Sequence, residues 1–469
     1  MFNAKLIQMA KLAKKIETEG GLKLEIVNPN AAGIDVSATE LQVCVPVGRA
    51  TPNNRVFGVY TQDLHEISSW LRGCGVTTVA MESTGIYWLP LFRVLDDDGF
   101  DVILVNALDV KNYSGRKTDE ADAEWLMVLH SYGLMKPCYQ PDSMSRQLRN
   151  LCRHRESLVM SSSREVLHLQ KSMEQMNLKL DNVFSDILGE SGQRIIEAIL
   201  AGERDAERLA SLADRRCRKS REEIMLSLEA TWDEEHLFVM RQSHDLYLYY
   251  QRLIEECDRE MESLLARYVV QVDAGDAEFV RSGKRKQRKS GVGMDIERYA
   301  YDLWGVNVMN VPGISHASLM KLVAELGAGF TLKFADAKHF VSWANLVPNN
   351  KISGGKLLSS KVPKRPNPVG IVFRQCANTL KSSKEPLGDY FRHIKARSGH
   401  LQAMVATGKK LATIFYTMVS RRAEYDVGEY SKHRKSRLDR DIIRLRDKLE
   451  RLENEQTRAI CKIMENSLL

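Results

Sequence analysis

Short apolar runs alternate with amphipathic stretches between residues 31 and 131, unlike the rest of the chain. Period-two runs rich in β-branched and aromatic residues predict strands, and apolar positions three and four apart predict helices. The expected strands are Ala31–Val36, Leu41–Val47, Arg55–Tyr60, Val76–Met81 and Asp101–Val105. The expected helices are Gln62–Arg72, Ile86–Leu95 and Lys117–Leu129.

The order of these elements indicates a fold. Three strands close together suggest an antiparallel meander, and the later strands alternate with helices. The order βββ-α-β-α-β-α is that of the ribonuclease H-like fold, whose nucleic-acid active site lies at the carboxyl ends of the central strands. We therefore expect an α/β domain over 31–140, preceded by an N-terminal arm over 1–30.

Beyond residue 140 the pattern is mainly helical. Ser143 to about Leu180 predicts a long amphipathic helix, and 141–302 as a whole predicts a helical coiled-coil linker with an insertion over about 181–300. Residues 303–420 predict a second, mainly α unit. In it, Val311–Ser315 resembles the turn of a helix-hairpin-helix, whereas Val347–Pro368 predicts an exposed loop.

The tail, 421–469, is highly charged and predicts a helix. Its apolar residues are spaced 4, 3, 4 and 3 apart, which is the seam of a short coiled coil. We favour self-association through this seam over a helix that packs within its own chain. The seam residues are Leu438, Ile442, Leu445, Leu449 and Leu452.

Composition narrows the function classes. The chain has 469 residues with 43% hydrophobic and 28% charged, so it is not a disordered chain. Its 8 cysteines form no CxxC pair, which argues against a structural zinc site and, with no signal peptide, favours a cytoplasmic protein. No apolar run approaches the length of a membrane span. The net charge of +7 is modest, so a nucleic-acid partner must be sought in local clusters.

Four carboxylates fall at informative places in the α/β domain. Asp35 is near the end of the first strand, Glu82 follows the fourth, and Asp119 and Asp122 share a face of the last helix. Taken singly, each is an ordinary turn or helix-cap residue. Together they would repel one another unless a cation held them, and hard oxygen ligands suit Mg²⁺ or Mn²⁺. Lys111, Arg116 and Lys117 precede the helical pair, where a nucleic-acid backbone would approach.

A second constellation surrounds Ser353 in the predicted loop. Ser353 is followed by Gly354 and Gly355, so its hydroxyl is expected to be exposed on a permissive backbone. Such a hydroxyl suits attack on phosphorus, with cations balancing the charge. A flexible basic loop with an inert serine is the alternative, and no Walker A pattern is present. The cations are Lys351, Lys356, Lys361, Lys364 and Arg365.

These motifs resemble the DEDD-type insertion-sequence transposases, the "one-ten" insertion-sequence family. The resemblance rests on Gly33–Ser37, Met81–Trp88 and Lys117–Ala123, and on Val311–Ile314 with Ser353–Lys356. It implies a RuvC-like nuclease domain, a coiled-coil linker and a transposase domain. It also implies that Asp35, Glu82, Asp119 and Asp122 bind metal, and that Ser353 is the nucleophile that links covalently to DNA.

The same resemblance implies the partners. They are donor and target DNA, a structured bridge RNA that directs recombination, and further copies of the chain in a dimer or tetramer. Two alternatives stay open. One is a RuvC-like, structure-selective nuclease that uses water in place of Ser353. The other is a nucleic-acid-binding scaffold without catalysis, in which only the basic residues matter.

Overall fold

The computed structural model describes residues 25–83, 85–106, 119–270, 279–284, 291–363, 366–426, 428, 439 and 442–457, without the side chains of 119–121. The predicted N-terminal arm lies almost wholly outside these residues. The chain divides into two compact units, Met1–Gln140 and Pro141–Leu469.

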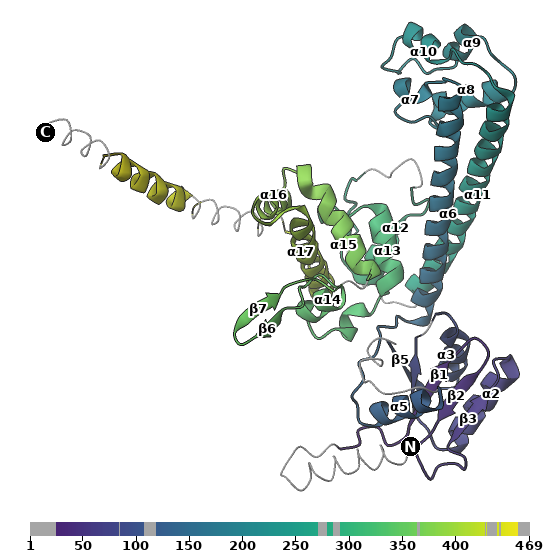
Figure 1. The fold of residues 1–469 in the computed structure, drawn as a ribbon, viewed down its shortest axis with the longest axis vertical. Coiled ribbons are helices and arrows are strands. Elements are labelled where there is room, and N and C mark those ends of the chain that lie inside the picture. The colour runs from purple at the N-terminus through teal and green to yellow at the C-terminus, as the bar shows by residue number, and fades with distance from the viewer. Residues whose placement is uncertain are drawn as a thin grey trace. The chain divides into compact units, whose positions relative to one another are not determined.

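The first unit is built on a five-stranded sheet in the order β3-β2-β1-β4-β5 (Figure 1). β1 pairs antiparallel with β2 and parallel with β4; β2 pairs antiparallel with β3, and β4 parallel with β5. The predicted meander and the predicted order of strands and helices are confirmed. The strands are β1 Ala31–Val36, β2 Leu41–Cys44, β3 Asn54–Phe57, β4 Thr78–Glu82 and β5 Asp101–Val105.

Helices cover this sheet because its strands carry apolar residues on both faces. Ile34 and Met81 lie in the cluster formed with α2 (Thr61–Gly73) and α3 (Trp88–Asp97). Cys44, on the other face, packs against Ala123 and Met127 of α5 (Asp119–Ser131). This mixed α/β core is compatible with a ribonuclease H-like DEDD transposase domain.

Two long helices of the second unit, α6 (Ser143–Gln175) and α11 (Glu234–Val270), pack along each other (Figure 1). The buried Arg155 of α6 binds Asp258 of α11, with Nη2 and Oδ2 3.1 Å apart. Asp258 also accepts from the Gly293 N–H at 3.0 Å, so the ion pair is satisfied inside the protein. The predicted helix after residue 143 is confirmed, and its partner is the last helix of the predicted insertion.

Short helices fill the chain between α6 and α11 and form their own apolar cluster with the adjoining ends of both. Their buried residues recur at helical spacing, as in Ile195, Ile196 and Ile199. These helices are α7 Leu180–Val183, α8 Glu190–Leu200, α9 Ala206–Ser211 and α10 Arg221–Ser227.

The rest of the second unit packs around aromatic side chains. Phe330, Phe340, Phe373 and Phe415 are fully buried and touch one another in stacked, tilted and T-shaped pairs. Its helices are α12 Ile296–Trp304, α13 His316–Leu326, α14 Ala337–Trp343, α15 Pro368–Thr379, α16 Pro386–Ser398 and α17 His400–Arg421. Short 3₁₀ turns are η1 Val308–Asn310, η2 Phe330–Lys333 and η3 Leu380–Ser382.

A two-stranded hairpin interrupts this helical unit. β6 (Lys351–Ser353) pairs antiparallel with β7 (Lys356–Ser359). The prediction of an exposed loop over Val347–Pro368 was therefore wrong in part: the segment is exposed, but its centre is ordered as a hairpin. Gly354 and Gly355 both have positive φ, +53° and +75°, which suits a tight two-residue hairpin turn.

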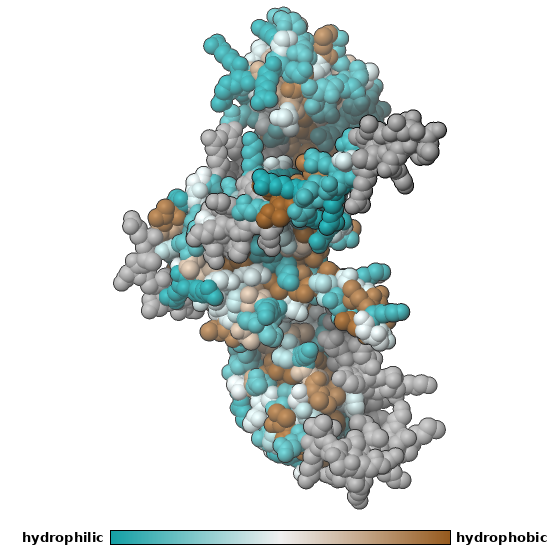
Figure 2. Space-filling view, turned by 90° about the vertical axis from the view of Figure 1, so that its left-hand side faces the viewer, coloured by the Kyte–Doolittle hydropathy of each residue, from teal (hydrophilic) through white to brown (hydrophobic). Residues whose placement is uncertain are grey.

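The face in Figure 2 is mostly hydrophilic, with small separate apolar patches. None of the helices in the described residues is both long and apolar enough to cross a bilayer.

Candidate active site

Asp35 and Glu82 lie at the same edge of the sheet. Ile34 of β1 pairs with Met81 of the parallel strand β4, so the next residue along each strand is one of the two carboxylates. Parallel neighbours are about 4.8 Å apart, and equivalent positions project from the same face. The Val36 N–H donates to the Asp35 carboxylate (Oδ1) at 3.0 Å, and both acids are half-buried.

The face from which these acids project is the one covered by α5. A Cβ added to Gly33, two residues before Asp35, would lie 2.2 Å from the Met127 nitrogen and 2.3 Å from the Ala123 oxygen of that helix. Only glycine allows a backbone to approach so closely. Gly33 therefore seats α5 directly on β1, on the face that carries Asp35.

The direction of α5 places its first turn at the carboxylate edge. Its last residue, Ser131, accepts hydrogen bonds from the N–H groups of Val27 and Asn28, which precede β1, at 2.8 and 2.9 Å. His130 Nε2 lies 2.8 Å from Thr78 Oγ1 at the start of β4, and burial lowers the His130 pKa. Since the end of α5 lies at the amino ends of these strands, its beginning points toward their carboxyl ends.

Asp119 and Asp122 occupy that first turn. Asp122 is half-buried, whereas the Asp119 side chain lies outside the described residues. Among the side chains that are described, no three His, Cys, Asp or Glu residues converge closely enough to hold a metal. The donors at this edge are nevertheless all carboxylates, the ligand type that Mg²⁺ and Mn²⁺ prefer. The chemistry of the donor set fits such an ion.

The segment after Glu82 presents apolar side chains that the sequence patterns did not single out. Ser83 donates its N–H and its hydroxyl to the Val105 carbonyl, both at 3.0 Å, which extends the β4–β5 pairing by one residue. Beyond Gly85, Ile86 is 78% and Tyr87 49% exposed. An aromatic residue a few positions after a strand-end carboxylate is the signal that could have identified Tyr87, because bases stack on aromatic rings.

Ser353 is the last residue of β6, and the register sets it opposite Lys356 of β7. Directly opposed residues have Cβ atoms about 4.5–5.5 Å apart on the same face. A serine and a lysine side chain therefore leave the same face of the hairpin at its exposed tip. Ser353 belongs to the second unit and the four carboxylates to the first.

The predicted nucleic-acid-binding cations divide into two groups. Lys351, Lys356 and Lys361 are exposed on or beside the hairpin. The Asn349 N–H donates to the Lys361 carbonyl at 2.9 Å, which closes the base of the hairpin. The other predicted residues, Lys111, Arg116, Lys117, Lys364 and Arg365, lie outside the described residues.

The predicted Pro-Gly turn makes its hydrogen bonds to other residues of the protein. Gly313 has φ +87°, and the Lys284 ammonium donates to the Val311 and Ile314 carbonyls at 2.8 and 3.0 Å. Burial lowers the Lys284 pKa. The hydroxyl of Ser315 caps α13 through the Ser318 N–H. This turn therefore orders the start of α13, and its side-chain contacts are structural.

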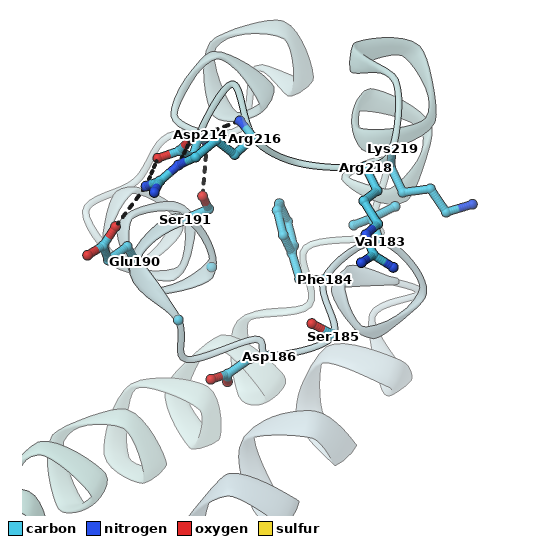
Figure 3. A pocket seen from close by; sticks show the side chains of 12 residues that line it. Val183, Phe184, Ser185, Asp186, Glu190, Ser191, Asp214, Arg216, Arg218 and Lys219 are labelled. Atoms are coloured by element: carbon cyan, nitrogen blue, oxygen red, sulfur yellow. Dashed lines mark hydrogen bonds and ion pairs between the residues drawn. The ribbon is translucent and has the colours of Figure 1, made fainter. Parts of the chain in front are cut away.

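A wide hollow of about 630 Å³ lies among α7–α10 and contains none of the predicted site residues (Figure 3). Three of its charged groups, Arg216, Asp214 and Glu190, lie close enough to pair. Arg216 binds Asp214 at 2.8 Å and lies 3.9 Å from Glu190, and the bond from Arg216 holds the pKa of Asp214 below its usual range. The hollow therefore contains none of the residues expected to carry the chemistry.

Two family models match the chain. Residues 32–178 match one described as Transposase, of the DEDD type found in IS110 elements. Residues 306–391 match one described as "Transposase IS116/IS110/IS902 family". These matches support a DNA transposase of the IS110 family. The first matched region, 32–178, contains all four predicted carboxylates, and the second, 306–391, contains Ser353. No curated protein matches the chain.

Proposed function

We propose that this chain is an RNA-guided recombinase of an insertion sequence, which cuts and rejoins DNA through a covalent phosphoserine link. The observation that carries the proposal is the position of Asp35 and Glu82. They are neighbours on the parallel strands β1 and β4, at the edge of the sheet toward which the first turn of α5 points. The two transposase matches support an enzyme acting on DNA, and transposases of the DEDD type typically depend on a divalent metal.

In this proposal Asp35, Glu82, Asp119 and Asp122 would hold Mg²⁺ or Mn²⁺. A bound ion supplies polarisation of the phosphodiester and stabilises the entering and leaving oxygens. The carboxylates orient the scissile phosphate at the sheet edge. Ile86 and Tyr87, exposed just after Glu82, contact bases next to the cleaved strand.

Ser353 is the proposed nucleophile. Its Oγ forms a bond to phosphorus, the bond from phosphorus to the 3′ oxygen breaks, and the proton lost by the serine is balanced by one gained at the 3′ hydroxyl. Lys356, opposite Ser353, stabilises the negative charge that develops on the phosphoryl oxygens. Attack by another 3′ hydroxyl reverses the step and joins new strands. The phosphoserine link conserves the bond energy, so no ATP is required.

Sequence choice is assigned to a bound RNA. Base pairing selects donor and target DNA while the protein holds backbones, as in other guided systems. Lys351 and Lys361 are exposed beside Ser353 and suit contact with phosphates. Composite sites that combine the carboxylates of one protomer with the Ser353 of another follow naturally from an oligomer.

A RuvC-like nuclease with water as nucleophile is the second candidate. The observation that favours it is that the four carboxylates belong to one compact unit and Ser353 to the other. Such an enzyme would cleave DNA with Ser353 replaced, and it would leave no protein attached to the product.

The test is to express the full chain with the noncoding flanks of its element, purify it, and incubate it with DNA that carries the element junction. Recombinant product is expected only with Mg²⁺ and with the co-purified RNA. Altering the RNA guide segment should redirect the product to a matching site. Product formed after the RNA is removed would reject RNA guidance, and bound DNA without any cleavage would indicate the non-catalytic scaffold.

A further inference from the structure

The tail helix carries an apolar stripe that nothing in the described residues covers. Residues 442–457 form a helix near the C-terminus (Figure 1). Every one of these residues is exposed. Ile442, Leu445, Leu449 and Leu452 are 46%, 65%, 57% and 52% exposed. Spacings of 3, 4 and 3 place them on one line along the helix, at alternating a and d positions of a heptad repeat.

The stripe is narrow, which distinguishes a coiled-coil seam from the broad face of a helix that packs on a globular core. The b, c and f positions are solvent-facing in a coiled coil and are mostly charged here: Arg444, Asp447, Glu450 and Arg451. Ile443, at a b position, is the exception. Ile442 at a with Leu445 at d is the combination that favours two parallel strands.

The charges beside the stripe select an orientation. In a parallel pair, the g residue of one helix lies beside the next e residue of the other. Lys448 at g then meets Glu453 at e of the second copy. This contact is attractive, and symmetry makes it twice.

The antiparallel pairing of the same stripes is disfavoured. With Ile442 opposite Leu452 and Leu445 opposite Leu449, g residues meet g residues and e residues meet e residues. Lys448 would then face Lys448, and Arg446 would face Arg446. Like charges across an interface cost free energy and act against that arrangement.

We propose that residues 442–457 form a parallel, in-register two-stranded coiled coil with the same segment of a second copy of this chain. The seam is short, so the pairing is concentration-dependent. It brings two copies together by their tails, outside both transposase matches. This inference does not depend on the chemistry proposed for Asp35 or Ser353.

Disulfide trapping in the full-length protein tests the orientation. In Leu445→Cys, a parallel pair sets the two new thiols against each other, whereas Ile443→Cys points its thiol away and is the matched control. Wild type gives the background of its 8 cysteines. We expect a covalent dimer from Leu445→Cys well above wild type and none above wild type from Ile443→Cys. Equal trapping at both positions, or no trapping at 445, would overturn the proposal.

Exchanging the charges at Lys448 and Glu453 is a second test of the parallel pairing. Lys448→Glu and Glu453→Lys each place like charges side by side and should shift dimerisation to higher protein concentration in sedimentation experiments. The double variant restores attraction in a parallel pair and should return the midpoint to its wild-type value. Unchanged midpoints in both single variants would show that the stripe contacts something other than a second tail. DNA cleavage measured on the same samples separates this result from a failure of the proposed chemistry.

Discussion

The carboxylate edge of the first unit and the Ser353 hairpin of the second are held by opposite means. Asp35 and Glu82 extend strands whose neighbouring residues, Ile34 and Met81, are fully buried. Ser353 instead ends a short strand in which all residues are exposed. The proposed metal-binding groups need fixed positions, which a core provides. The proposed nucleophile, on an exposed hairpin, can be altered with little effect on folding.

Replacing the hydroxyl should give the largest change in activity and almost none in stability. Ser353→Ala removes the only atom that can form the proposed link, so recombinant product should be lost completely. Unfolding should stay within about 0.5 kcal/mol of wild type, as at other exposed sites. Ser360→Ala, in the same exposed segment, is the control and should recombine normally. Retained product in Ser353→Ala would leave water as the nucleophile.

Neutralising a carboxylate should reduce cleavage strongly. Asp35→Asn and Glu82→Gln keep the side-chain shapes but weaken charge stabilisation, so cleavage rates should fall by about 10²–10³-fold or more. Asp101→Asn, at the amino end of β5 in the same sheet, is the matched control. Single-turnover cleavage at saturating Mg²⁺ measures the effect. Equal losses in all three variants would mean that the position of the acids at the carboxyl edge has no special role.

Crowding the contact between α5 and β1 should affect both stability and activity. Gly33→Ala forces a Cβ against the α5 backbone, and overpacking of this kind costs about 1–3 kcal/mol. The first turn of α5 would shift with Asp119 and Asp122, so cleavage should weaken too. Gly73→Ala meets no atom within 4 Å and should be neutral. Thermal melting and cleavage of both variants check this, and a Gly33→Ala protein with wild-type melting would contradict the close approach.

The smallest effect is expected at Lys356. Lys356→Gln removes one cation beside Ser353, which should slow strand cleavage about tenfold, the equivalent of one modest charged hydrogen bond. Lys351→Gln changes a lysine of the same hairpin that the register does not set opposite Ser353, so it should slow cleavage less. A larger loss of cleavage rate in Lys351→Gln than in Lys356→Gln would indicate that Lys351, at the other end of the hairpin, contacts the phosphate.

The sequence predicts the first unit well because its signals are local. The alternation in Leu41–Cys44 and the helical spacing in Thr61–Gly73 each follow from side chains close together in the chain. The placement of Asp35 beside Glu82 followed from strand order. By contrast, the pairing of α6 with α11 depends on Arg155 and Asp258, residues far apart in the sequence, and no local pattern reveals it.

The Ser353 hairpin was missed for a different reason. Its strands are only three and four residues long, and the segment Val347–Pro368 contains four Pro and two adjacent Gly. Such composition predicts a loop, although the adjacent Gly354 and Gly355 between two short β-prone runs are a hairpin signal. The turn matters for the proposed chemistry because its register sets Lys356 opposite Ser353.

The most direct test of the central claim is to look for the covalent link itself. Wild-type protein, its RNA and junction DNA would be incubated with Mg²⁺, digested with protease and nuclease, and analysed by mass spectrometry. The account predicts a nucleotide attached to Ser353, absent in Ser353→Ala and strongly reduced in Asp35→Asn and Glu82→Gln. Efficient cleavage with no nucleotide on any serine would contradict it and identify a nuclease that uses water.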